Sequence, residues 1–202
     1  MARALPTGAV GAPGRLVVVR HGATQWSKSG RHTGRTDLPL LPEGEAEAVE
    51  LGHRLAGVEP ALVLSSPLRR ALETCRLAGY GDRVTTSVAL AEMDYGDYEG
   101  LTTAEIRAGR PGWDLFVDGC PGGETIEDVA ARVGGVFDRL RDDPALAGRD
   151  VLVFAHGHAL RAGAAHWLGL APVHARHFQI GAGRTGWLSW EYEWTTVQGW
   201  NL

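Results

Sequence analysis

The chain has 202 residues, a formal net charge of −4 and two cysteines, Cys75 and Cys120. This length fits one α/β domain that buries roughly 70% of its unfolded surface, so its stability does not require disulfide bonds. The acidic balance, without a basic run interleaved with aromatic residues, argues against a nucleic-acid surface, and no stretch is apolar enough to span a membrane.

The cysteines and the first residues favour a particular cellular compartment. Cys75 and Cys120 fit neither a disulfide framework nor a zinc spacing, which suits a reducing compartment, so we expect inert thiols and a cytoplasmic location. Residues 1–14 contain one arginine and no long apolar core. We therefore expect a disordered tail there rather than a signal peptide, followed by a single domain over 15–202.

The first predicted element is a strand that begins near residue 15. Leu16 to Val19 form an uninterrupted, mostly β-branched apolar run, which is typical of a strand buried on both faces of a parallel sheet. The run ends in Arg20, His21 and Gly22. Because ligands of open α/β sheets bind outside the carboxyl ends of the strands, this edge would present a cation and an imidazole to an anion.

Residues 22–41 follow as a long loop over that strand end. They are rich in Gly, Ser, Thr and Arg and lack apolar periodicity, and loops of this length in compact domains usually serve a function. The run GRHTGRT at 30–36 superficially resembles a phosphate-binding loop. Its spacing is wrong and no Gly-Lys-Ser/Thr follows, so we exclude a nucleotide-binding loop.

A helix is predicted at 42–56. Pro42 suits its first position, and Val49, Leu51 and Leu55 are expected to form its buried side. A second buried strand follows at 61–66, and Ser66 can cap a helix at 67–78 that begins with Pro67. The order strand, helix, strand, helix indicates an α/β protein.

The second half of the chain continues the alternation after an irregular, aromatic and acidic insertion at 89–123. A match to GxGxxG at 181–186 precedes a strand-like run instead of a helix, so we treat it as chance. The further predicted elements are a strand at 84–88, a short helix at 102–108, a helix at 124–141, a strand at 151–155, a helix at 158–168, and strands at 176–180 and 186–193.

The strand at 151–155 repeats the design of the first strand. Its apolar run, VLVFA, leads directly into His156 and Gly157. Two buried strands that both end in His-Gly are much less likely to arise by accident than one.

Four motifs together resemble the histidine phosphatase superfamily, the phosphoglycerate mutase-like group. They are RHGAT at 20–24, SSPLRRALET at 65–74, LAEMDYGDYEG at 90–100 and AHGHALR at 155–161, in the order of the family. WSKSGRHTGRTD at 26–37 and DGCPGGET at 118–125 look most like the branch of sedoheptulose-1,7-bisphosphatases and broad acid phosphatases. The resemblance implies a three-layer α/β/α fold with a mostly parallel central sheet, and one histidine phosphatase domain over 15–202.

The resemblance also implies roles for the residues at the two strand ends. His21 would be the nucleophile and form a phosphohistidine, while Arg20, Arg70 and His156 would hold the phosphoryl oxygens. Arg70 is preferred to Arg69 because the sequence from Arg70, RALET, is similar to the family signature Arg-Ala-x-x-Thr. Without the resemblance, both arginines would be read as solvated side chains on a helix.

The proton donor is expected to be a carboxyl group near the leaving oxygen. Among the acidic residues of 92–99, Glu92 matches the position of the acid in the family, in a run Leu-x-Glu before Tyr-Gly. Glu92 would then act as a base and activate water. The alternative is that this stretch is an acidic, solvated loop.

Substrate contacts are implied for the loop after His21 and for the segment after the second histidine. Ser27 departs from the asparagine common there in mutases, and the pair His158 and Arg161 either reaches a second phosphate or stabilises the fold. The implied substrate-binding residues are Thr24, Trp26, Lys28, Thr33, Gly34, Gly157, His158 and Arg161.

The leading hypothesis is a metal-independent phosphatase of small phosphorylated metabolites that needs no cofactor. A 2,3-bisphosphoglycerate-dependent phosphoglycerate mutase is the first alternative, although the segment between Gly100 and Gly123 is shorter than the lid-bearing region of the mutases. A metal hydrolase built on His156 and His158, or a module that only binds phosphorylated ligands, are further alternatives. Tryptophans at the surface could serve an interface, so a homo-oligomer is also considered.

Overall fold

The computed structural model describes residues 14–202, so the tail expected at 1–14 lies, apart from Gly14, outside the described residues. Within this range, six strands form one sheet in the order β3-β2-β4-β1-β5-β6. Within the group β1, β2, β3 and β4, all neighbouring strands pair in parallel. Strand β5 pairs antiparallel with β1, and β6 pairs antiparallel with β5 and forms one edge of the sheet. The strands are β1 (Leu16–Arg20), β2 (Leu62–Ser65), β3 (Val84–Thr86), β4 (Val151–Ala155), β5 (Thr185–Glu191) and β6 (Trp194–Trp200).

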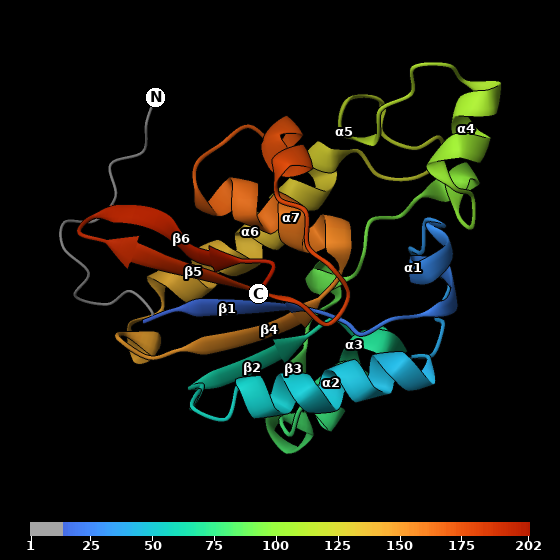
Figure 1. Ribbon diagram of the computed structural model, residues 1–202. Helices are drawn as coiled ribbons and strands as arrows, with labels where there is room; N and C mark the ends of the chain where they lie inside the picture. Colours follow the sequence, from blue (N-terminus) through green and yellow to red (C-terminus); the bar gives the residue numbers. More distant parts are fainter. Residues whose placement is uncertain (1–13) are drawn as a thin grey trace.

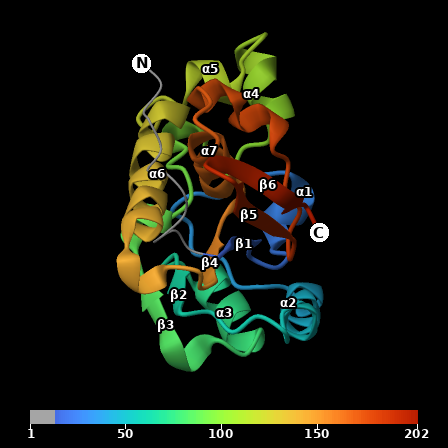
Figure 2. The ribbon, with the colours of Figure 1, turned by 90° about the vertical axis from the view of Figure 1, so that its left-hand side faces the viewer.

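Helices cover both faces of the sheet and give the expected three-layer α/β/α arrangement (Figure 1). On one face lie α2 (Pro42–Arg54) and α3 (Arg69–Leu77), and on the other lie α6 (Ile126–Asp142) and α7 (Gly157–Trp167). Figure 2 shows α4 and α5 together at one end of the molecule. The shorter helices are α1 (Gln25–Ser29), α4 (Thr103–Gly109), α5 (Leu115–Asp118) and the 3-10 turns η1 (Gly81–Arg83), η2 (Val88–Leu90), η3 (Gly96–Tyr98), η4 (Pro144–Leu146) and η5 (Pro172–His177).

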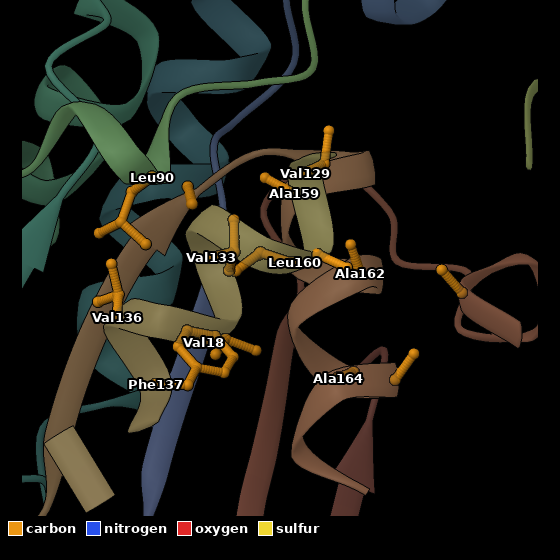
Figure 3. Packing of buried hydrophobic residues seen from close by; sticks show 14 of the residues in the cluster. Val18, Leu90, Val129, Val133, Val136, Phe137, Ala159, Leu160, Ala162 and Ala164 are labelled. Carbon is orange, nitrogen blue, oxygen red and sulfur yellow. The ribbon is translucent and has the colours of Figure 1, made fainter. Parts of the chain in front are cut away.

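Strand β1 lies in the middle of the sheet and divides the core. Successive side chains of a strand point to opposite faces. Val18 accordingly packs with α6 and α7, close to Val133 and Phe137 (Figure 3), whereas Val17 and Val19 pack with residues of α2 and α3. All four apolar residues of β1 are fully buried, as the run predicted.

The packing of α6 on α7 depends on a small residue. A Cβ atom on Gly163 of α7 would lie 2.6 Å from the ring of Phe137 in α6, closer than any ordinary contact. Glycine therefore lets the two helices approach. No helix within residues 14–202 is long and apolar enough to cross a membrane.

Two features in the first half of the chain differ from the sequence-based prediction. The loop at 22–41 contains the short helix α1, which Thr24 begins through a capping box with Ser27. Helix α3 begins at Arg69 rather than at Pro67, and Leu68 occupies its N-cap position. Ser66 still accepts a hydrogen bond from the Leu68 N–H at 3.3 Å, but in the turn before the helix.

One residue predicted for the core of α2 lies at the surface. Ala48 and Leu51 are buried, and so is Leu55 just beyond the helix, whereas Val49 is 44% exposed. Each helical residue is rotated by about 100° from the one before it, so Val49 faces away from the stripe that Ala48 begins.

The predicted strand at 176–180 does not exist in the structure. The 3-10 turn η5 ends at His177, and the last strand is β6, which pairs with β5 as a hairpin. Tyr192 lies in the turn with a positive φ of 54°. Because the turn lacks the glycine or Asn-Gly that usually marks such a hairpin, the sequence predicted only one strand at 186–193.

Candidate active site

The parallel pairing of β1 with β4 brings the two His-Gly segments together. Arg20 and Ala155 are partners in the register, so His21 and His156 follow side by side at the carboxyl ends of the strands. The centroids of their rings lie 5.1 Å apart. Strand β2 ends beside them, and Ser66 Oγ lies 2.7 Å from His156 Nε2.

The His21 ring has a defined protonation. Its Nδ1 lies 2.8 Å from the carbonyl oxygen of Gly22, which only accepts hydrogen bonds, so Nδ1 carries the proton and Nε2 holds a lone pair. Burial, and then the charges of Arg20 and Arg70, hold the pKa of His21 well below its usual value. The ring is therefore a neutral imidazole whose Nε2 atom carries a free lone pair.

The backbone around His21 is tightly held. The His21 N–H donates to the Ala155 carbonyl at 3.1 Å and the Gly22 N–H donates to Thr74 Oγ1 at 3.0 Å. A Cβ atom on Gly22 would lie 2.3 Å from the carbonyl oxygen of Gly44 in α2. Only glycine fits at this position without moving the helix.

Arg20 lines the cavity beside His21. Its Nη1 atom donates to the Ile180 carbonyl at 2.7 Å, while its buried Nε atom has no hydrogen-bond partner among residues 14–202. An unsatisfied donor on a guanidinium is suited to an incoming anion.

Arg70 is fully buried and lies behind His21. Its guanidinium donates to the carbonyls of Thr33, Gly34 and Thr36 at 3.0 to 3.1 Å, and its Nε donates to His156 Nδ1 at 3.2 Å. The interpretation of Arg70 as a solvated helix side chain is therefore wrong. The same bonds tie the loop after β1 to the site.

His156 is the second fully buried group behind His21. Because its Nδ1 accepts the bond from Arg70, its proton lies on Nε2, which donates to Ser66 Oγ. Burial and the charge of Arg70 hold the pKa of His156 well below its usual value. The structure thus brings Arg70 and His156 to the site, but neither belongs to the residues that line the cavity.

Glu92 reaches the cavity from the segment after η2. It is only 9% exposed, so it is not part of a solvated loop. Its Oε1 accepts hydrogen bonds from the N–H groups of Met93 and Ala159 at 2.9 Å, and its Oε2 accepts one from His158 at 3.1 Å. The first turn of α7 therefore holds this carboxylate in place.

The cavity has a volume of about 360 Å³ and its ionisable side chains are mainly basic. Burial lowers the pKa values of His32 and His158, which therefore remain neutral near pH 7. Glu92 is the acidic side chain among the lining residues. The basic ones are Arg20, His21, Arg31, His32, His158, Arg161 and Arg176.

His158 and Arg161 project from α7 into the cavity lining. The Tyr95 hydroxyl and His158 Nδ1 lie 2.7 Å apart. Arg161 donates to the carbonyls of Ala175 and Arg176 at 3.1 and 2.9 Å, so it also fixes η5 against α7. The two readings of Arg161, contact with substrate and support of the fold, are therefore compatible.

The expected substrate loop is only partly at the cavity. Thr24 is fully buried and caps α1, Lys28 is exposed and pairs with Glu43, and the Trp26 ring packs next to Gly100. These three predicted contacts lie away from the cavity lining. The cause is α1, whose turn directs these side chains to other neighbours.

Other predicted contacts are closer. Thr33 and Gly157 line the cavity together with His158 and Arg161. Gly34 lies behind the wall, where its N–H donates to both carboxylate oxygens of Glu99 at 3.0 and 2.9 Å.

Several cavity residues were missed by the sequence analysis. Arg31 and His32 belong to the GRHTGRT run, and Tyr95 belongs to the motif that includes Glu92, so a motif marked their segments. Arg176 and Gln179 had no such signal, because their segment was predicted as a strand. The missed lining residues are Ser27, Gly30, Arg31, His32, Tyr95, Arg176, Gln179, Ile180 and Gly181.

The sequence analysis also considered a metal site and expected two inert thiols. Among residues 14–202, no group of three or more His, Cys, Asp or Glu side chains is arranged to hold a metal ion. Cys75 and Cys120 are unpaired, and burial raises the pKa of each thiol to about 12. Thiols with such pKa values are weak nucleophiles.

Comparison with known proteins gives a consistent family assignment. The model of the protein family described as "Histidine phosphatase superfamily (branch 1)" matches residues 16–202 of this chain. An acid phosphatase of Mycobacterium tuberculosis is 38% identical over 88% of this chain and 87% of that protein. A sedoheptulose 1,7-bisphosphatase of Saccharomyces cerevisiae is 38% identical over 77% of this chain and 68% of that protein.

Mutases and solved structures match as well. A 2,3-bisphosphoglycerate-dependent phosphoglycerate mutase of Cytophaga hutchinsonii is 32% identical over 83% of this chain and 84% of that protein. The solved structure of an open reading frame product of Mycobacterium tuberculosis superposes with a TM-score of 0.86 at 37% identity, covering 94% of this chain and 97% of that one. Sequence and fold therefore point to the same group of proteins.

Proposed function

Because this chain belongs to the histidine phosphatase superfamily (branch 1), we propose that it hydrolyses small phosphomonoesters through a phosphohistidine on His21. The observation that carries the proposal is the Nδ1 hydrogen bond of His21, which leaves the lone pair on Nε2, beside Arg20 in a basic cavity. The family match over 16–202 supports a single histidine phosphatase domain. The unpaired, buried thiols support a cytoplasmic location.

In the first step, His21 Nε2 attacks phosphorus and forms an N–P bond. The bond from phosphorus to the leaving oxygen breaks, and its electron pair stays on that oxygen. Glu92 in its protonated form supplies a proton to this oxygen, so an alcohol leaves. We assign the proton to Oε2, which receives a single backbone N–H, whereas Oε1 receives two.

The phosphoryl oxygens carry the charge that the cations must stabilise. Arg20 offers its unpaired Nε to one of them. Arg70 and His156 lie behind His21, and a short reorientation of either side chain toward the phosphoryl group would exchange a protein hydrogen bond for one to substrate. Arg20 and Arg70 supply the positive charge that the reaction requires and the neutral His156 supplies a hydrogen-bond donor, so the proposal invokes no metal ion or cofactor.

In the second step, water hydrolyses the phosphoenzyme. The Glu92 carboxylate takes a proton from the water, whose oxygen attacks phosphorus and forms a P–O bond. The N–P bond breaks and returns its electron pair to His21 Nε2. Inorganic phosphate is released, and Glu92 is again protonated for the next cycle.

We propose sugar phosphates or sugar bisphosphates as the substrate class. A cavity of about 360 Å³ is of the size that holds a small metabolite. Its arginines come from separate segments, with Arg20 at the end of β1, Arg31 in the loop, Arg161 on α7 and Arg176 in η5. Cations distributed in this way favour a substrate with more than one anionic group.

A phosphoglycerate mutase is the second candidate, because relatives with that name also match the chain. A mutase would return the phosphoryl group to bound phosphoglycerate instead of water. The short segment between Gly100 and Gly123 favours hydrolysis, since it leaves less chain to cover the phosphoenzyme. Interconversion of phosphoglycerates in the presence of 2,3-bisphosphoglycerate would distinguish the mutase.

The test is phosphate release in EDTA from sedoheptulose-1,7-bisphosphate, fructose-1,6-bisphosphate, 3-phosphoglycerate and p-nitrophenyl phosphate. His21→Ala is expected to abolish release, whereas His53→Ala, at an exposed site on α2, should behave like the wild type. Rapid quenching should trap a phosphohistidine in the wild type. Loss of activity in EDTA, or full activity of His21→Ala, would contradict the proposal.

A further inference from the structure

The peptide group that receives the His21 hydrogen bond is itself bound to a carboxylate. The Gly22 carbonyl accepts the bond from His21 Nδ1 at 2.8 Å, and the N–H of the same peptide group, on Ala23, donates to Glu47 Oε2 at 2.8 Å. The three groups form one chain from the imidazole through an amide to a carboxylate. Glu47 belongs to α2 and is not one of the residues that line the cavity.

Such a chain changes the properties of its first member. A carboxylate is a stronger acceptor than a neutral group, and hydrogen bonds in series polarise one another. Electron density drawn along the Gly22–Ala23 amide makes its carbonyl oxygen more negative. The His21 Nδ1–H is then held more firmly, and more electron density remains on Nε2.

We propose that Glu47 is a positioning residue, which holds His21 in the Nδ1–H tautomer and strengthens Nε2 as a nucleophile through the Gly22–Ala23 peptide. This inference rests on the proposed function, in which His21 attacks phosphorus. It assigns Glu47 no contact with substrate.

The reaction creates a need for this carboxylate. When Nε2 bonds to phosphorus while Nδ1 stays protonated, the ring gains positive charge. Arg20 and Arg70 lie close enough to oppose that charge. An anion connected to the ring through one peptide group offsets part of this repulsion, and it does so from the side opposite the substrate.

The backbone on both sides of Glu47 is closely packed. A Cβ atom on Gly44, one helical turn before it, would lie 2.2 Å from the Ala23 carbonyl oxygen, and that oxygen also accepts the Leu41 N–H at 2.9 Å. Gly183 packs on the other side, where an added Cβ would lie 3.0 Å from Glu47 Cβ. This packing places the Glu47 carboxylate against the Ala23 N–H, to which it is hydrogen-bonded at 2.8 Å.

The test compares Glu47→Gln, Glu47→Ala and Glu45→Gln. Glutamine at position 47 keeps an acceptor for Ala23 but removes the charge, and alanine removes both. Glu45→Gln removes the same charge from an exposed position in the first turn of α2 and serves as the matched control. Circular dichroism establishes that each variant is folded.

Two measurements report on the inference. Rapid quenching gives the rate constant of phosphoenzyme formation, which should fall roughly tenfold in Glu47→Gln, further in Glu47→Ala, and remain unchanged in Glu45→Gln. Nuclear magnetic resonance of the His21 ring gives its tautomer and the Nδ1–H proton shift. We expect this proton to move upfield in Glu47→Gln, because its hydrogen bond weakens, and to stay in place in Glu45→Gln.

The outcomes separate this inference from the proposed function. An unchanged rate and an unchanged Nδ1–H shift in Glu47→Gln would overturn the role of the charge, even if Glu47→Ala were slow. An Nε2–H tautomer in the wild type would overturn it as well. If the wild type formed no phosphohistidine, the proposed function would fail, while the resonance measurement would still decide whether Glu47 acts on His21.

Discussion

Replacing Arg70 with alanine is expected to destabilise the whole protein as well as its active site. The buried guanidinium donates to the carbonyls of Thr33, Gly34 and Thr36 and to His156. Each buried group left without its partner costs about 1–3 kcal/mol. Since water can reach part of the loop after the truncation, we expect the free energy of unfolding to fall by about 3–5 kcal/mol in total.

The assay is urea unfolding of the wild type, Arg70→Ala and Arg69→Ala. Arg69 is the exposed neighbour, whose backbone N–H, not its side chain, binds Asp37. Its truncation should therefore change stability by less than about 0.5 kcal/mol. In a thermal scan, Arg70→Ala should melt roughly 6–20 °C below the wild type. Equal unfolding midpoints for the two variants would refute the structural role of Arg70.

Three more predictions concern the acid, the glycine after the nucleophile and pH. Glu92→Gln should slow hydrolysis of alkyl phosphates by about 100-fold or more but spare p-nitrophenyl phosphate, whose leaving group needs no proton; equal slowing of both would show that Glu92 is not the acid. Gly22→Ala should lower stability by about 1–3 kcal/mol and abolish turnover, because its Cβ meets the α2 backbone at 2.3 Å, whereas Gly57→Ala, in open space, should do neither. The depressed pKa values of His21 and His156 mean that the unfolded chain binds more protons than the folded protein below about pH 6.5. Stability should therefore fall as pH decreases from 7 to 5, with a slope that steepens below about pH 6.5 and reaches at most about 1.4 kcal/mol per pH unit for each histidine, and a urea midpoint that stays constant or rises over this range would contradict the assignment.

The hydrogen bonds of Arg70 also affect how a phosphoryl group would bind. Its hydrogen bonds connect α3, the loop at 33–36 and His156 into one unit behind His21. A phosphoryl group that recruited Arg70 would compete with backbone carbonyls for the same donors. Binding of an oxyanion such as vanadate should therefore alter the amide resonances of this loop.

Much of the fold could be predicted because it depends on local patterns. A buried strand leaves a continuous apolar run, as at Leu16 to Val19, and a helix on its face leaves a periodic one, as in α6. The hairpin of β5 and β6 was not predicted, because its turn residue with a left-handed conformation is Tyr192 and not a glycine. The pairing of Glu191 with Trp194 in the hairpin places the turn at Tyr192, and this pairing is not visible in the local sequence.

The candidate site shows the same division. The sequence by itself determined that His21 and His156 follow buried strands and that Glu92 belongs to an acidic motif, because these facts are local. Only the tertiary structure decided that Thr24 and Lys28 turn away from the cavity.

The connection of Glu47 to His21 likewise could be recognised only in the tertiary structure. Glu47 lies 26 positions after the histidine, on an exposed-looking helix with several other acids. What distinguishes it is the close approach of α2 to the Gly22–Ala23 peptide, which glycines at 22 and 44 permit. The spacing of residues along the chain does not predict such a contact. The contact depends on how α2 packs against the end of β1, from which a long loop separates it in the sequence.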